Sequence, residues 1–268
     1  MKAYPFTLAS ALFSLLLAVP ALAQEQQVVI PLSEPGQPGT LELSVIRGSV
    51  SVSGYDGDEV IINYDGDEEP RQSREETEDG LRRISPGNSG FEASESNNTV
   101  TVSNLSPIRR MDFEISVPYN FSLELALVTG DDITVDNING EIAISHVNGG
   151  ITLTNVGGSA TVNTVNGDIT ATNREVAEQR PMAFSSVNGD IDVTLPQTVQ
   201  VSARMNSEMG EIYTDFDMEL DEGDDQTGSP GSNAFNISVN RWMNGTINGG
   251  GPEYMFKTLR GDIFIRRQ

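Results

Sequence analysis

The chain has 268 residues, no cysteine and a formal net charge of −23. So acidic a surface repels nucleic-acid phosphates, which excludes DNA and RNA as partners. Without cysteine there is no disulfide framework, no thiolate metal site and no lipid-bearing cysteine of a bacterial lipoprotein, so stability must come from core burial and backbone pairing.

The first 23 residues have the pattern of a secretory signal peptide. Lys2 provides a positive start, residues 8–19 are apolar and uncharged, and Ala21-Leu22-Ala23 is a small-x-small cleavage pattern. The apolar run is shorter than the roughly 20 residues that a membrane span needs. We therefore predict cleavage after Ala23, export, and no transmembrane segment in the mature chain; a retained anchor is the alternative.

Short runs in which Val, Ile, Thr and Phe alternate with polar residues dominate the remainder. Residues 48–54 (GSVSVSG), 98–104 (NTVTVSN) and 112–118 (DFEISVP) are bounded by Gly, Asn and Pro. Alternation with such boundaries is typical of β-strands. Only residues 173–179 could form a helical turn or two before a proline. The sequence therefore predicts an all-β protein.

Two stretches are too polar to bury much apolar surface. Residues 59–90 contain the charged run DGDEEPRQSREETEDG, and residues 215–233 are acidic and then rich in Gly, Ser and Pro. Both are predicted to be exposed loops inserted into a strand framework. A metal site in the second, acidic loop is the alternative interpretation.

A nine-residue repeat follows. Val-Asn-Gly-Asp-Ile occurs at residues 165–169 and 187–191, with looser copies at 138–142 and 147–151. Apolar residues lie two and four positions after each glycine and two before the next, as at Val147, Val156 and Val165, and we expect them to point inward. The glycines predicted to form structural turns are Gly130, Gly140, Gly149, Gly158, Gly167, Gly189, Gly210 and Gly261.

The constant interval favours stacked coils over separate hairpins. Asn-Gly also suits two-residue hairpins, but only stacking requires each apolar residue to lie above its equivalent. Glycine adopts left-handed backbone angles freely and asparagine is next best, which suits both to the corners. We predict a β-solenoid with about 18 residues per coil, which places Ile142 over Ala160 and Ile151 over Ile169. Handedness and the number of faces do not follow.

The predicted organisation has three parts. Residues 1–23 form the signal peptide. Residues 24–127 form an N-terminal β-strand region that leads into the solenoid. Residues 128–268 form the repeat β-solenoid, with the acidic loop inserted near residues 215–233.

Several segments together resemble the bacterial putative adhesin family. They are residues 48–64 (GSVSVSGYDGDEVIINY), 113–135 (FEISVPYNFSLELALVTGDDITV), the Asn-Gly-Asp-Ile series and 249–265 (GGGPEYMFKTLRGDIFI). The resemblance extends from about Gly39 to Arg267. It implies a secreted or envelope-linked β-solenoid domain of unknown function with repeated Gly-Asp-Ile turns, and it supplies no catalytic residue.

The turn acids are the candidates for a metal site. Asp168, Asp190 and Asp262 would project from stacked corners, where carboxylates can hold Ca²⁺. However, the Gly-Gly-x-Gly-x-Asp pattern of calcium-binding β-rolls is missing, and the units at 147–155 and 156–164 lack the acid. We predict structural turns without a metal or cofactor, with calcium binding as the alternative.

No residue has the sequence context of a catalytic group. His146, the single histidine, lies beside a predicted corner and is expected to face solvent; no nucleophile elbow surrounds it. Arg260-Gly261-Asp262 matches the integrin-recognition tripeptide, but it aligns with the repeat, which accounts for its Gly and Asp.

These features predict an exported, non-enzymatic protein in the periplasm or on the outer surface of a Gram-negative bacterium. Its expected role is to present a rigid polar β-face to an envelope protein or a glycan. The residues expected on that face are Thr152, Thr154, Thr161, Asn163, Thr170 and Thr172. The alternatives are a carbohydrate-active enzyme built on a β-helix and a calcium-stabilised scaffold.

Overall fold

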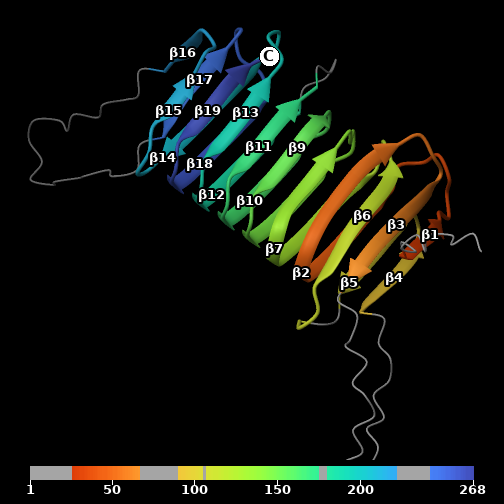
Figure 1. The fold of residues 1–268 in the computed structure, drawn as a ribbon. Helices are drawn as coiled ribbons and strands as arrows, with labels where there is room; N and C mark the ends of the chain where they lie inside the picture. The colour runs from red at the N-terminus through yellow and green to blue at the C-terminus, as the bar shows by residue number, and fades with distance from the viewer. Residues whose placement is uncertain (1–25, 67–89, 105–106, 175–179, 222–241) are drawn as a thin grey trace, which may run out of the picture.

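The computed structural model describes residues 26–66, 90–104, 107–174, 180–221 and 242–268, and within them the chain forms strands and no helix (Figure 1). The predicted signal peptide, residues 67–89 of the first loop, 175–179 of the helical candidate and 222–233 of the acidic loop lie outside these ranges. No helix in the described part of the chain is long and apolar enough to span a membrane.

Each regular coil consists of two strands joined at a sharp corner. The pairs are β8 (Ile142–Asn148) with β9 (Ile151–Val156), β10 (Ala160–Asn166) with β11 (Ile169–Asn173), and β12 (Met182–Asn188) with β13 (Ile191–Leu195). The first strands stack in parallel to form one wall, here called face one, and the second strands form the opposite wall, face two (Figure 1).

The strand register confirms the predicted solenoid. Ala160 pairs with Ile142 on face one, and Ile169 pairs with Ile151 on face two. Equivalent positions in these coils are therefore 18 residues apart, and two nine-residue units make one coil.

The order of coils in space departs from their order in sequence at both ends. Near the N-terminus, β2 (Thr40–Tyr55) has neighbours on two sides. On one side it pairs with β5 (Thr99–Asn104) and β6 (Met111–Pro118), and on the other it pairs with β7 (Ser122–Asp136). Both β2 and β7 run through both faces. Because β7 crosses residues 127 and 128, where the sequence analysis divided the chain, the coils on either side of that division belong to one stack.

A similar insertion occurs at the C-terminal end. The last coil, β18 (Glu253–Arg260) and β19 (Ile263–Arg267), lies between the β12–β13 coil and the coil formed by β14 (Val201–Ser207) and β15 (Ile212–Thr214). The C-terminal strands thus fill the space between two coils that precede them in the chain.

Antiparallel strands cover parts of both ends of the stack. At one end, β1 (Gln26–Pro31), β3 (Glu59–Gly66) and β4 (Phe91–Ser96) pair antiparallel onto the first coils. At the other end, β17 (Met243–Ile247) and β16 (Met218–Leu220) extend face one. Such strands cover sheet edges that would otherwise offer unpaired backbone groups to other chains.

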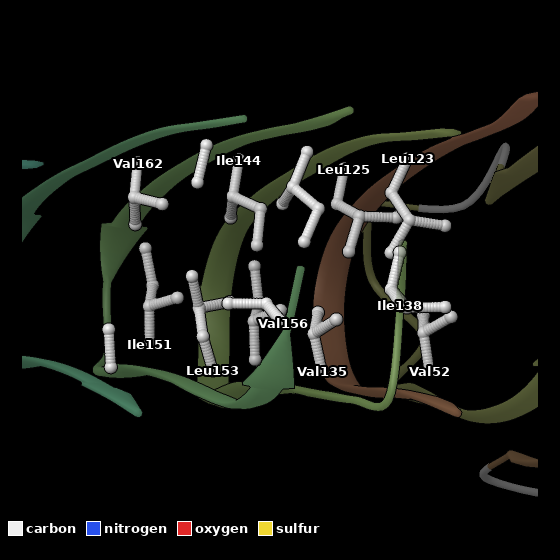
Figure 2. Packing of buried hydrophobic residues seen from close by; sticks show 14 of the residues in the cluster. Val52, Leu123, Leu125, Val135, Ile138, Ile144, Ile151, Leu153, Val156 and Val162 are labelled. Atoms are coloured by element: carbon white, nitrogen blue, oxygen red, sulfur yellow. The ribbon is translucent and has the colours of Figure 1, made fainter. Parts of the chain in front are cut away.

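The core is a single apolar layer between the two faces (Figure 2). Leu125, Ile144 and Val162 point inward from face one, and Val135 and Leu153 point inward from face two. Full burial of each such side chain contributes about 1.5–3 kcal/mol, so the repeat holds the walls together by apolar contact at every coil.

Candidate functional site

The predicted turn glycines lie at two kinds of corner. The forward corner joins face one to face two within a coil, as at residues 148–150 and 166–168. The return corner leads from face two to the next coil, as at residues 137–141 and 155–159. Forward corners contain Gly130, Gly149, Gly167, Gly189, Gly210 and Gly261, whereas Gly140 and Gly158 lie in return corners.

Close contact between stacked backbones requires glycine at the forward corners. A Cβ atom on Gly167 would lie 2.0 Å from the carbonyl oxygen of Gly149, and one on Gly189 would lie 2.0 Å from that of Gly167. Gly189 also has a φ of 157°, but Gly167 is not among the positive-φ residues. Steric exclusion by the coil below therefore requires glycine even where the backbone angle does not.

The forward-corner asparagines form hydrogen bonds through their side chains. The expectation that asparagine occurs there because it tolerates left-handed backbone angles is therefore wrong for these corners. Asn166 donates to Asn148 with Nδ2 and Oδ1 2.9 Å apart, and Asn188 donates to Asn166 over the same distance. The positive-φ asparagines near the repeat are instead Asn137 and Asn155, in return corners. The motif thus builds an amide ladder along one edge of the solenoid.

The calcium candidates form a second ladder. Oδ1 of Asp168 accepts the backbone N–H of Asp190, and Oδ1 of Asp190 accepts that of Asp262. Oδ1 of Asp262 in turn accepts the N–H of Glu211, and all three distances are 2.8 Å. Within the described ranges, no group of three or more Asp, Glu, His or Cys residues is placed to hold a metal ion. One oxygen of each carboxylate is therefore engaged in holding adjacent coils together.

The Arg-Gly-Asp tripeptide belongs to the same ladders. Arg260 donates to the Asn188 Oδ1 atom at 3.2 Å, and Asp262 accepts the Glu211 N–H described above. The tripeptide therefore continues the stacking contacts of the repeat.

Buried hydroxyl groups, which sequence reasoning missed, close the forward corners from inside. Thr164, Ser186 and Thr258 donate to the carbonyl oxygens of Gly149, Gly167 and Gly189, each at 3.0 Å. These residues occupy an inward position, three before each corner glycine, where the repeat places polar residues. Hydrogen bonding satisfies polar groups that would be costly to bury alone.

His146 lies in that inward row, so the expectation that it faces solvent is wrong. It is 2% exposed, because strand alternation from Ile142 and Ile144 turns it into the core. Among the described residues, neither ring nitrogen has a well-placed hydrogen-bond partner, although the Gly150 backbone lies near the ring. Burial lowers the pKa of His146 below its usual value of 6.5, and the backbone of Gly150 and the Asp132 carboxylate partly oppose this effect.

The apolar residue before the glycine also differs between the corners. Val156, in a return corner, is 1% exposed, as predicted, whereas Val147 and Val165, before forward corners, are each 39% exposed and point outward. The expectation that all three point inward is therefore wrong for two of them. The row of exposed aliphatic side chains along face one is Ile46, Val128, Val147, Val165 and Val187.

The predicted polar residues all lie on the outside, but on two opposite walls. Thr161 and Asn163 belong to β10 on face one, whereas the other four belong to β9 and β11 on face two. On face two they extend into two in-register rows of threonine. One row is Thr134, Thr152 and Thr170, and the other is Thr154, Thr172 and Thr194.

Face two ends in an aromatic cluster that the repeat pattern did not reveal. The Tyr213 and Phe264 rings stack with centroids 5.2 Å apart and an interplanar angle of 9°. The Arg266 guanidinium lies 4.9 Å from the Phe264 centroid and bonds both carboxylate oxygens of Asp192 at 2.8 and 2.9 Å. The only sequence signal was that "GEIY" and "GDIF" place an aromatic residue at the same position of two repeats.

A small pocket lies on the return side, where the chain crosses between coils. Its lining includes Asn173, Arg174, Arg180 and Tyr254, and the described residues that line it include no Asp, Glu or His. Its volume of about 20 Å³ accommodates roughly one water molecule. Arg174 is engaged by the side chains of Asn137 and Asn139.

Comparison with known proteins relates this architecture to one family. The family described as Toastrack DUF4097 matches residues 36–248. Among solved structures, a putative cell adhesion protein from Clostridium sporogenes is similar, with a TM-score of 0.51 and 12% sequence identity, over 91% of this chain and 100% of that chain. At this identity the likeness shows the fold alone. No curated protein matches the chain.

Proposed function

Because this chain belongs to the Toastrack DUF4097 family, we propose that it is an exported, non-enzymatic binding or scaffold module of the bacterial cell envelope. It presents a rigid polar β-face to a glycan or a protein. The observation that carries the proposal is the pair of in-register threonine rows on face two, which repeat short hydrogen-bonding side chains at each coil.

The rigidity of that face follows from the corners. Amide, carboxylate and hydroxyl groups along the forward corner bond from one coil to the next. The backbone positions that carry the threonines are therefore fixed relative to one another before a ligand arrives, which reduces the entropy lost on binding.

The non-enzymatic role is supported by how the candidate reactive groups are used. The turn carboxylates accept backbone N–H groups, and the single histidine, His146, is buried. Release of reducing ends from an envelope polysaccharide by the purified protein would favour the carbohydrate-active enzyme instead.

The adhesin-like role is a further part of the proposal. The similar Clostridium sporogenes structure is described as a putative cell adhesion protein, and the polar outer rows suit contact with a surface. Purified mature protein is expected to retain a component from solubilised envelope in a pull-down. A matched variant, Thr152→Ala/Thr170→Ala on face two, should reduce retention more than Thr161→Ala/Asn163→Ala on face one.

Export to the periplasm or outer surface of a Gram-negative bacterium rests on the N-terminal pattern. Fractionation followed by intact-mass analysis should recover a chain that begins at Gln24 outside the cytoplasm. Recovery of the full-length chain in the cytoplasm would contradict export, and full-length chain in the inner membrane would favour the retained anchor.

The calcium-stabilised scaffold remains a testable alternative, because the forward-corner acids run in one row. Since each of the three candidate carboxylates already accepts a backbone N–H, we expect the same Tm in millimolar Ca²⁺ and in chelator. A cation that binds only the folded state raises Tm by mass action, so a clear rise would support the alternative.

A further inference from the structure

The C-terminal end of face two holds one exposed aromatic ring in a fixed orientation. Tyr213 on β15 pairs in register with Phe264 on β19, and the two rings stack. Arg266 reaches toward Asp192 on β13, so it covers the Phe264 ring on the side away from Tyr213. Both faces of the Phe264 ring are thereby covered and Phe264 is half-buried, while Tyr213 remains 46% exposed.

The free face of the Tyr213 ring is turned toward the outer edge of β15. Stacking occupies the opposite face, and in the described residues β15 pairs with β19 alone. The Tyr213 hydroxyl donates to the Glu211 carboxylate at 3.1 Å. This hydrogen bond restricts rotation of the Tyr213 side chain. The ring is therefore an apolar platform whose orientation is set before any ligand binds.

Hydrogen-bonding groups surround this platform. Glu211 and Asp215 bond to β19 through their backbones. Backbone direction alternates along a strand, so the N–H and C=O groups of Ile212 and Thr214, between them, face the open edge. The Glu211 and Asp215 carboxylates are on exposed residues of the same segment. Oδ1 of Asp215 accepts the Arg267 N–H at 2.7 Å and Oε2 of Glu211 accepts the Tyr213 phenol, so the second oxygen of each carboxylate is the one offered to a ligand. An apolar surface ringed by acceptors and a few donors suits a molecule with an apolar face and a hydroxyl-bearing rim.

We propose that this end of face two binds a neutral pyranose ring of a glycan, stacked on the free face of Tyr213. The C–H face of the sugar covers the aromatic ring, and its hydroxyl groups donate to Glu211, Asp215 and the open carbonyl groups of β15. This inference rests on the proposed function, because it names the ligand class and the anchoring residue of the same binding face.

Charge selects the neutral class of glycan. Four carboxylates, those of Asp192, Glu211, Asp215 and Asp262, lie at or beside the cluster. The cations beside them are Arg266, already paired with Asp192, and the exposed Arg267 on the same strand, so negative charge is in excess. A uronate or phosphorylated sugar would meet repulsion in addition to the net charge of −23. A neutral sugar meets no such repulsion, and its hydroxyl groups find acceptors and a few backbone donors.

The same edge is poorly suited to a protein strand. β15 has only three residues, Ile212–Thr214, with Glu211 and Asp215 on either side. Short edges bordered by charges are among the devices that discourage strand addition. The edge therefore favours the glycan over an added strand, which becomes an outcome of the test.

The test is a calorimetric and NMR titration of the purified mature protein with cellohexaose, laminarihexaose and maltohexaose, with hexagalacturonate as the acidic control. We expect at least one neutral hexaose to bind, hexagalacturonate not to bind, and the ring signals of Tyr213 to shift. Loss of an aromatic contact costs about 0.5–1.5 kcal/mol, so Tyr213→Ala should weaken binding up to about tenfold, whereas Tyr213→Phe should retain most of the affinity. Tyr55→Ala, at the other end of face two, is the matched control and should bind normally.

Each result separates this inference from the proposed function. If no neutral hexaose binds, or if Tyr213→Ala binds as tightly as wild type, the glycan platform is wrong. If an envelope protein is then retained in the pull-down, the proposed function stands without it; if its capture depends on Tyr213, the edge serves a protein strand. If neither sugar nor envelope component binds, both proposals fail. The wild-type NMR shifts keep the test valid even if Tyr213→Ala does not fold.

Discussion

Forward and return corners of the repeat both have an aliphatic residue two positions before a glycine, yet they direct that residue to opposite sides of the wall. In the return corner, Val156 and Ile138 turn inward and fill the narrow edge of the core (Figure 2). In the forward corner, Val147 and Val165 face solvent, and the inward row beneath the corner is occupied by Thr164, Ser186 and their equivalents.

This difference teaches that a nine-residue period in sequence encodes an eighteen-residue period in structure. Forward corners are closed by hydrogen bonds from a buried hydroxyl, an amide ladder and a carboxylate ladder, as at Thr164, Asn166 and Asp168. Return corners also have hydrogen bonds between coils, but there the inward position before the glycine is filled by an apolar side chain, Ile138 or Val156. The two edges of the solenoid should therefore respond differently to the same kind of substitution.

The largest expected effect is at a forward-corner glycine. Gly167→Ala would place its Cβ 2.0 Å from the Gly149 carbonyl oxygen, a backbone atom that cannot move alone. We expect a loss of about 3 kcal/mol in the free energy of unfolding, measured by urea denaturation. Gly36→Ala is the control: that glycine has a φ of 79° and open space around it, so the cost should be about 1 kcal/mol. Equal costs would contradict the steric role of the stack.

A second expected effect concerns His146, which lies at the end of the hydroxyl row, between Leu127 and Thr164. An unfolded imidazole takes up a proton near pH 6.5, whereas burial lowers the pKa of the folded one, so protonation favours unfolding. Stability should be fully present above about pH 6.5 and fall as the pH decreases below it, by at most about 1.4 kcal/mol per pH unit. Chemical denaturation between pH 7.5 and 5 should show this decline in wild type and a smaller one in His146→Thr. Parallel profiles would show that His146 does not titrate in this range.

A smaller effect is expected in the carboxylate ladder. Asp190→Ala removes the acceptor of the Asp262 backbone N–H and should cost about 1 kcal/mol, whereas Asp190→Asn keeps an acceptor oxygen and should cost less. The exposed Asp58 provides a control for loss of one negative charge. If Asp190→Ala were as stable as Asp58→Ala, the ladder would contribute nothing to coil stacking.

Much of the fold could be predicted because the nine-residue sequence period coincided with the positions of the apolar side chains. The interval of nine residues, with apolar side chains at fixed offsets, was enough to place Ile142 over Ala160. The inserted coils β2 and β18–β19 could not be foreseen, because nothing in a local repeat states which coils are neighbours in space. Contacts between residues far apart in the chain, such as Asp190 with Asp262, decide that order.

The candidate site was less predictable than the fold. Exposed threonines were correctly placed outside, but their division between two walls depends on which corner each strand follows. The direction of His146 was missed because its position beside a corner was given more weight than the alternation from Ile142. Tyr213 and Phe264 escaped notice because an insertion between their repeats hides that the two strands are adjacent.

The measurement that tests the two-corner account most directly is the stability of Val156→Thr against Val165→Thr. Threonine keeps the shape and β-branching of valine, so the two variants differ in whether the new hydroxyl is buried. We predict a cost of about 2 kcal/mol for Val156→Thr, which buries an unpaired hydroxyl, and less than about 0.5 kcal/mol for the exposed Val165→Thr. Equal costs, or a larger cost at Val165, would contradict the alternation of forward and return corners.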